Sequence, residues 1–271
     1  CVKGAGCASP RKRIGWNPEA GDSPKSDRAL TPGRRLGQGH PMSFFTPDKE
    51  KLSKARDRLL EEIAANARET KNWTGRARFS DAVMAAMAHV PRHEFVDPKD
   101  TVAAYVNRPQ SIGHGQTISQ PYIVALMSDL LDLEPTDRVL EIGTGCGYQA
   151  AVLAELAARV YSIETVKPLA DQARRRLKSL GYDNVEVSTG DGFDGWLDQA
   201  PFDAVIVTAA PERIPQTLIQ QLRPGGRMAI PIGRVHETQT LVRVTKDAEG
   251  NVSEQAGLPV AFVPMVAKKF R

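Results

Sequence analysis

The stretch VLEIGTGCGYQ, residues 139–149, carries more information than any other part of this chain. An apolar, strand-like run containing Glu141 is followed by three alternating glycines, Gly143, Gly145 and Gly147, and then by a helix-like segment. Glycines at such a turn allow positive φ and bring backbone N–H groups close to a ligand. The stretch therefore predicts a site for a nucleotide-like cofactor.

A second acidic residue follows the next apolar run. Residues 160–163 are expected to form a buried strand, and Glu164 ends it. A carboxylate at the tip of the second strand can accept hydrogen bonds from both hydroxyls of a ribose. Taken alone, the glycine run also occurs in loops that bind nothing, and Glu164 could be a solvated loop residue. Their order along the chain favours cofactor binding.

Two acidic residues distinguish between cofactors. Glu141 would repel a pyrophosphate, but it favours the cationic methionine end of a sulfonium cofactor. Asp191, between Gly190 and Gly192, offers a carboxylate to an adenine amino group, although an ordinary Asp-Gly turn has the same sequence. Together they favour S-adenosyl-L-methionine over a nicotinamide dinucleotide.

The order of the expected elements indicates an α/β fold over about residues 121–271. Alternating strands and helices predict a doubly wound, mostly parallel, Rossmann-like sheet, whose ligands bind at the carboxyl ends of the strands, where Thr208 also falls. Strands are expected at 138–142, 160–163, 185–187, 204–207 and 228–231, and helices at 148–158, 167–180 and 214–222. Residues 224–226, PGG, are expected to end the last helix. Residues 239–245 and 260–266 are expected to form a closing antiparallel pair, joined by a turn at 247–251.

Four motifs outside the glycine turn carry a more specific signal. They are VPRHEFVD at 90–97, IGHGQTISQP at 112–121, PFDAVIVTAA at 201–210 and FVPM at 262–265. With these motifs in order, the chain from about residue 76 to 266 resembles the bacterial protein-L-isoaspartate O-methyltransferases. The resemblance implies an S-adenosylmethionine-dependent methyltransferase fold and methyl transfer to the free α-carboxylate of L-isoaspartyl residues in damaged proteins. Gln110-Ser111 replaces the Leu-Pro of many bacterial relatives, and Cys146 stands where Ser is frequent.

The resemblance also assigns roles to individual residues. Ser119 corresponds to the family's active-site serine, and we expect it to donate a hydrogen bond that orients the substrate carboxylate. That carboxylate is ionised at neutral pH, so no general base is required. Ser119 is also a plausible N-cap of the helix that follows, and the two roles are compatible. The expected cofactor-binding residues are Ile112, Gly113, Gly115, Gln116, Thr117, Glu141, Gly143, Thr144, Gly145, Gly147, Glu164, Asp191, Gly192 and Thr208. The expected substrate-binding residues are Ile118, Ser119, Gln120, Phe262 and Val263.

The histidines do not enter this chemistry. His114 invites a role as a base, but the reaction has no proton for it to remove, and His93 is better interpreted as structural. The scattered histidines and Cys146 lack the spacing of metal ligands, so no metal is expected.

Residues 1–41 differ from the rest in composition. They are rich in Gly, Pro, Ser and basic residues and are expected to form a disordered extension. Their eight Lys or Arg and three acids leave about −1 of the chain's net charge of +4 for residues 42–271, which argues against a nucleic-acid groove there. Met42 is an attractive start, and a lipid-modified Cys1 is the competing idea.

The remaining 42–271 are expected to form one methyltransferase domain. A helical and substrate-loop region, 42–120, would precede the Rossmann-like core, 121–271, and an amphipathic helix at 48–70 would bury Leu52, Leu59, Leu60 and Ile63. No apolar run reaches the ~20 residues that span a bilayer. Three cysteines suit a reducing compartment. We therefore expect a cytoplasmic monomer acting on isoaspartyl-containing proteins and peptides, without nucleic-acid or membrane partners.

Two alternatives remain open at this stage. A methyltransferase acting on RNA or a small molecule would share the glycine turn. A non-catalytic module could hold nucleic acid through the basic residues 1–41.

Overall fold

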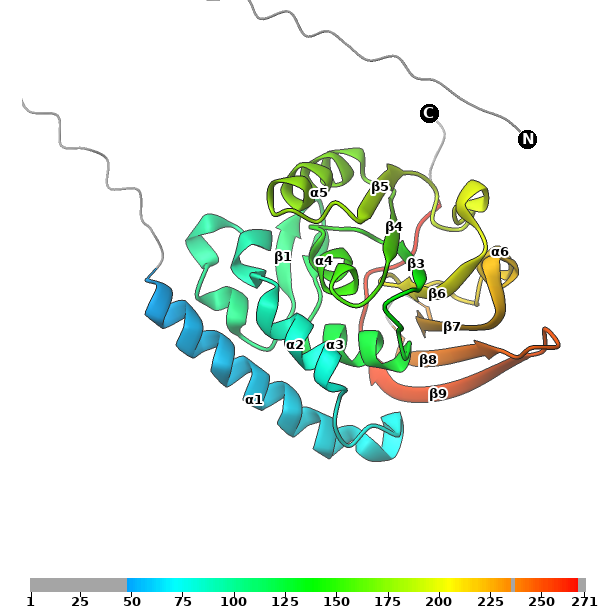
Figure 1. Cartoon of the computed structure of the whole chain (residues 1–271), viewed down its shortest axis with the longest axis horizontal. Coiled ribbons are helices and arrows are strands. Elements are labelled where there is room, and N and C mark those ends of the chain that lie inside the picture. The colour runs from blue at the N-terminus through cyan, green and yellow to red at the C-terminus, as the bar shows by residue number, and fades with distance from the viewer. Residues whose placement is uncertain (1–47, 235–236, 268–271) are drawn as a thin grey trace, which may run out of the picture. The chain divides into compact units, whose positions relative to one another are not determined.

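In a computed structural model that describes residues 48–234 and 237–267, apolar runs such as 204–207 form the central strands of a seven-stranded sheet (Figure 1). The strands lie in the order β5-β4-β3-β6-β7-β8-β9, and the first five in this order are parallel. Their bounds are β3 Arg138–Ile142, β4 Arg159–Glu164, β5 Val185–Thr189, β6 Phe202–Val207, β7 Leu222–Ile232, β8 Gln239–Lys246 and β9 Val252–Val260. The chain runs outward from β3 to β5 and returns to β6, so the switch of direction that creates a ligand crevice lies between β3 and β6.

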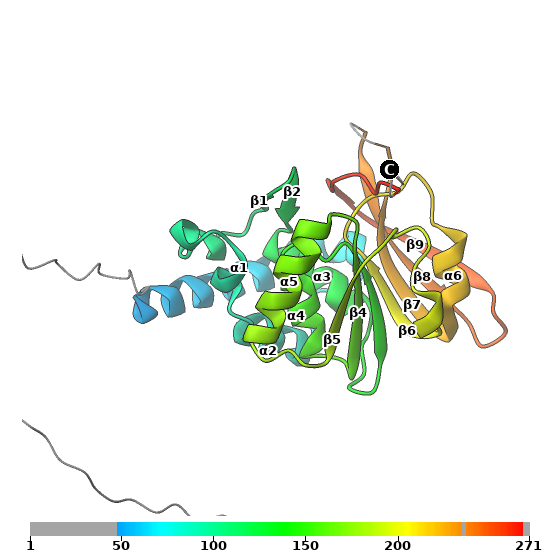
Figure 2. The ribbon, with the colours of Figure 1, turned by 90° about the horizontal axis from the view of Figure 1, so that it is seen from above.

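Helices cover both faces of this sheet, as the doubly wound prediction requires (Figure 2). Helices α1 to α5 lie on one side of the sheet and the short α6 lies on the other (Figure 2). Their bounds are α1 Lys49–Thr74, α2 Asp81–His89, α3 Pro121–Leu130, α4 Tyr148–Ala154, α5 Lys167–Ser179 and α6 Gln216–Gln221. Short 3-10 turns occur at Arg92–Phe95, Pro98–Asp100, Ala103–Tyr105 and Leu197–Gln199, and a hairpin of β1 Gln110–Gly113 and β2 Gln116–Ile118 stands apart from the main sheet.

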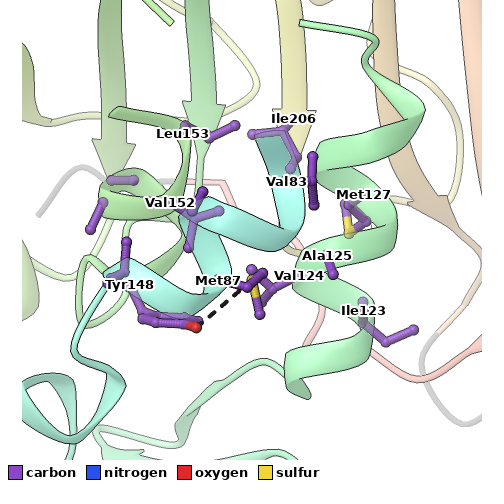
Figure 3. Close-up of a cluster of buried hydrophobic side chains, with 14 of the residues drawn as sticks. Val83, Met87, Ile123, Val124, Ala125, Met127, Tyr148, Val152, Leu153 and Ile206 are labelled. Atoms are coloured by element: carbon purple, nitrogen blue, oxygen red, sulfur yellow. Dashed lines mark hydrogen bonds between the residues drawn. The ribbon is translucent and has the colours of Figure 1, made fainter. Parts of the chain in front are cut away.

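The centre of the larger core is α3, every residue of which is buried. Val124 and Met127 of α3 belong to one cluster with Met87 of α2, Val152 of α4 and Ile206 of β6 (Figure 3). Each such side chain contributes roughly 1.5–3 kcal/mol when removed from water. This packing fixes the N-terminal end of α3, which faces the candidate active site.

The amphipathic helix expected at 48–70 is confirmed as α1. Asp48 caps it by accepting hydrogen bonds from the N–H groups of Glu50 and Lys51, at 3.1 and 3.3 Å. The predicted Leu52, Leu59 and Ile63 are buried, and Leu60 is partly buried against the core.

Three sequence-based boundaries were wrong. The strand that pairs with β8 is β9, Val252–Val260, and not residues 260–266, which follow it as an irregular segment with one bridge from Pro264 to Ala210. The helix expected at 148–158 ends at Ala154. Residues 224–226 do not follow a helix directly but lie inside β7, where its pairing with β6 is interrupted.

The expected extension, residues 1–41, lies outside the described residues. Within the described part of the chain, none of the helices is both long enough and apolar enough to cross a bilayer.

Candidate active site

The glycine turn lies at the carboxyl end of β3 and has the predicted backbone conformation. Gly143, Gly145 and Gly147 have φ values of 97°, 53° and 93°. Gly143 N donates to Ile163 O at 2.8 Å, and Thr208 Oγ1 donates to Gly143 O at 2.7 Å. A Cβ at Gly143 would overlap Thr208 Oγ1. The turn is thus anchored to the ends of both neighbouring strands, and only glycine fits its first position.

Glu164 ends β4 and faces this turn. Its Oε2 accepts from Gly145 N at 2.8 Å, and its Oε1 accepts from Val166 N at 2.9 Å. Glu164 also lines a groove beside the turn, together with Gln116, Thr117, Gly143, Gly145, Gly192, Thr208 and Val263. A carboxylate has about four lone-pair positions, so Glu164 retains acceptor capacity for ligand hydroxyls.

Asp191 and Gly147 are among the predicted cofactor residues that do not line this groove. Asp191 Oδ1 accepts from Phe193 N at 2.9 Å, the geometry of an Asx turn, while the adjacent Gly192 does line the groove. Gly147 begins α4 as its N-cap.

Glu141 lies beneath the turn and is fully buried. Ser162 Oγ donates to Glu141 Oε2 and is hydrogen-bonded to Thr144 Oγ1 at 2.5 Å. The Thr144 side chain is therefore also buried beneath the turn. Within residues 48–234 and 237–267, Glu141 Oε1 has no hydrogen-bond partner. Burial raises the pKa of Glu141 to about 8, from an ordinary value of 4.5. This carboxyl is therefore mostly protonated at neutral pH in the protein alone.

Residues 112–116, part of the expected substrate-loop region, lie in the β1–β2 hairpin, which reaches the glycine turn. The Ile112 side chain packs against Gly145, where a Cβ would come within 3.3 Å of Ile112 Cδ1. Gly113 and Gly115 have φ values of 84° and 71° and are exposed, and neither lines the cavities described here. The hairpin leads directly through Ile118 to Ser119.

Ser119 is not the N-cap of α3. The cap position belongs to Gln120, which makes no side-chain capping bond, and Pro121 opens the helix. Because proline has no backbone N–H, a proline at this position leaves one fewer donor at the start of the helix that needs a capping partner. The Ser119 hydroxyl therefore makes no capping hydrogen bond to α3.

Ser119 instead lines a cavity of about 770 Å³. Its walls come from α1 (Asn66, Thr70), from the β2–α3 junction (Thr117, Ser119, Gln120) and from residues 258–263, including Phe262 and Val263. Thr117, Thr208 and Val263 also line the groove at the glycine turn, so the cavity and the groove adjoin. Ile118 is buried and lines a smaller cavity of about 30 Å³ between Ser119 and the turn.

Comparison with known proteins identifies the family. The family model described as "Protein-L-isoaspartate(D-aspartate) O-methyltransferase (PCMT)" matches residues 69–270, most of the chain. The chain belongs to this family. It is 56% identical over 211 residues to "Protein-L-isoaspartate O-methyltransferase 2" of Polaromonas sp., covering 78% of this chain and all of that relative. It is 52% identical to "Protein-L-isoaspartate O-methyltransferase 1" of Cupriavidus necator, covering 84% of this chain and 88% of the relative.

Solved structures agree with this assignment. One named protein-L-isoaspartate O-methyltransferase is 27% identical, with a TM-score of 0.67, over 79% of this chain and 66% of that one. A second, a putative protein-L-isoaspartate O-methyltransferase from Plasmodium falciparum in complex with S-adenosyl-L-homocysteine, has a TM-score of 0.64 over 78% of this chain and 98% of that one. At 24% identity, the second structure supports the fold alone.

Sequence reasoning missed three contributors to this methyltransferase site. Arg92 is fully buried and donates to Ser119 O at 2.8 Å. Gln239 holds the cavity wall, since its side chain pairs with both Phe262 N, at 2.6 Å, and Phe262 O, at 3.0 Å. α1 supplies Asn66 and Thr70, although the family match begins only at residue 69. The VPRHEFVD motif contained a signal for Arg92. Nothing in the sequence indicated a site role for Gln239 or for the residues of α1.

Proposed function

We propose that this chain transfers the methyl group of S-adenosyl-L-methionine to the free α-carboxylate of L-isoaspartyl residues in damaged proteins and peptides. The observation that carries the proposal is the position of Ser119, on the wall of the 770 Å³ cavity that adjoins the glycine turn. Membership of the isoaspartyl methyltransferase family supports the same reaction. It also disfavours the alternatives of an RNA or small-molecule methyltransferase and of a non-catalytic module.

The glycine turn fits the cofactor. Its close packing on Thr208 leaves no room for a side chain at Gly143, and Glu164 presents carboxylate oxygens beside it. When bound, S-adenosyl-L-methionine supplies a methyl group made electrophilic by the sulfonium. We assign Glu164 to the ribose hydroxyls. Glu141, beneath the turn, would favour the cationic end of the cofactor by ionising when a positive charge approaches.

Residues 263–266 form one wall of the cofactor groove. This segment is held to Ala210 by two backbone hydrogen bonds, Ala210 N to Val263 O at 2.8 Å and Met265 N to Ala210 O at 2.9 Å. These bonds fix the position of the wall beside the glycine turn.

Ser119 has the main role on the substrate side. The isoaspartyl carboxylate is ionised at neutral pH, so the protein needs only to orient one of its oxygens and to exclude water. The Ser119 hydroxyl donates to that carboxylate, and Gln120, Phe262 and Val263 complete the wall around it. Because the N–H and C=O of Phe262 already pair with Gln239, Phe262 offers a fixed surface, not a free edge for strand pairing.

Methyl transfer from labelled S-adenosyl-L-methionine tests the proposal. An isoaspartyl peptide is compared with the same peptide containing normal aspartate, and only the first is expected to gain label. Equal labelling of both, or of neither, would contradict it. The proposal also includes a cytoplasmic monomer, which sedimentation of the purified chain and fractionation of its host cells would check.

A further inference from the structure

Arg92 is the largest fully buried side chain of the described residues. Its Nε donates to Ala104 O at 2.8 Å and its Nη2 to Ser119 O at 2.8 Å, while its guanidinium lies over the Tyr148 ring, 4.6 Å from the centroid. Its Nη1 has no hydrogen-bond partner among the residues that the structure describes. A fully buried cation normally has an acidic partner, because burying an unpaired charge is expensive.

Arg92 has no such partner in the described part of the chain. Its titratable neighbours are Tyr105, Cys146 and Tyr148, and none of the described carboxylates forms an ion pair with it. Burial lowers the pKa of its guanidinium, the direction expected of an uncompensated positive charge, yet an arginine remains charged in proteins. The protein therefore maintains a net positive charge at this point of its interior.

The position of this charge relates it to the site. Arg92 contacts two residues, Ser119 and Tyr148, that line the small cavity between the cavity at Ser119 and the glycine turn. The acidic groups of the site, Glu141 and Glu164, belong to β3 and β4. The site therefore combines carboxyl groups from the sheet with a guanidinium bonded to the backbone of Ser119.

We propose that Arg92 is a positioning residue, whose buried charge and bond to Ser119 make the site prefer a carboxylate over a neutral group of the same shape. The inference rests on the proposed function. The hydrogen bond fixes the backbone of Ser119, which aims its hydroxyl, and the charge acts on the substrate carboxylate through a poorly screened interior.

The test compares two peptides that differ only in charge. One carries isoaspartate and the other has its free α-carboxyl replaced by a carboxamide. Their dissociation constants are measured on the full chain in the presence of S-adenosyl-L-homocysteine. We expect Arg92→Met to lower the preference for the carboxylate about tenfold, the effect of a unit charge about 12 Å away at an effective dielectric constant of about 20. Arg92→Lys should keep that preference within about twofold, while kcat falls because the planar bond to Ser119 is lost.

A matched control is Arg227→Met. Arg227 is also mostly buried, but it pairs with Asp137 at 2.6 Å, at the start of β3 and away from the site. This variant should lose stability without any change in the carboxylate preference. If Arg92→Met weakens both peptides by the same factor, or neither, Arg92 is merely structural and the inference is overturned.

A second measurement does not depend on the variants folding. In the unmodified protein, a buried charge keeps the carboxylate preference within about twofold between 0.05 and 0.5 M salt, since burial limits screening. If the carboxylate preference disappears at high salt, exposed charges cause it and the role of Arg92 is refuted. Absence of methylation of the isoaspartyl peptide by the unmodified protein would instead refute the proposed function, so the two failures are distinguishable.

Discussion

Replacing Glu141 with glutamine should change how the stability of the protein depends on pH. In the folded protein, burial raises the pKa of Glu141 from 4.5 to about 8. Between these two pH values the folded state holds a proton that the unfolded state has released. The folded state therefore binds more protons, and stability is lost as pH rises through this window.

The magnitude follows from the width of the window. Each pH unit lowers the free energy of unfolding by about 1.4 kcal/mol, so the loss attributable to Glu141 is roughly 3 to 4 kcal/mol between pH 5 and pH 8. Glutamine is neutral at every pH and has nearly the same shape as the protonated acid. Glu141→Gln should therefore match the original protein near pH 5 and exceed its stability by roughly 3 to 4 kcal/mol at pH 8.

Urea unfolding at pH 5, 6, 7 and 8 measures this difference. Glu186→Gln is the matched control, because Glu186 is an exposed residue of β5. Its curve should remain parallel to that of the original protein. If the Glu141→Gln curve is also parallel to it from pH 5 to pH 8, Glu141 does not hold a proton in the folded state and the reasoning is refuted.

Three other substitutions separate the roles within the site. Ser119→Ala should lower kcat about 10- to 100-fold while the affinity for S-adenosyl-L-homocysteine stays within about twofold, because the hydroxyl orients only the substrate. Steady-state kinetics and calorimetry measure the two quantities, and a fall in both would contradict this role of Ser119. Glu164→Ala should weaken that affinity about tenfold or more, as expected for lost hydrogen bonds to a charged group, and unchanged affinity would contradict the ribose assignment. Gly143→Ala should destabilise the protein by about 2–3 kcal/mol and abolish cofactor binding, since its Cβ meets Thr208 at a positive φ; urea unfolding with unchanged stability would count against this.

The parallel strands were predictable because both of their faces are buried. Residues 138–142 and 204–207 are almost completely buried, and both predictions matched β3 and most of β6. β9 was not predictable in this way. It is an edge strand with mostly exposed residues. A prediction from apolar patterning therefore favours the more apolar residues 260–266.

The site was predictable where backbone geometry determines the residue type. Positive φ at Gly143, Gly145 and Gly147 follows from the glycine pattern, and the position of Glu164 follows from the end of a strand. Arg92 could not be placed from its neighbours in sequence, because charged side chains are usually exposed. Only the folded chain brings it to Ser119, 27 residues away.

A crystal structure of the protein with S-adenosyl-L-homocysteine and an isoaspartyl peptide tests the central claim most directly. We predict a free α-carboxylate within hydrogen-bond distance of Ser119 Oγ, inside the cavity formed with residues 258–263, and one of its oxygens facing the cofactor sulfur. A peptide bound with that carboxylate away from Ser119, or a cofactor bound away from the glycine turn, would contradict the account.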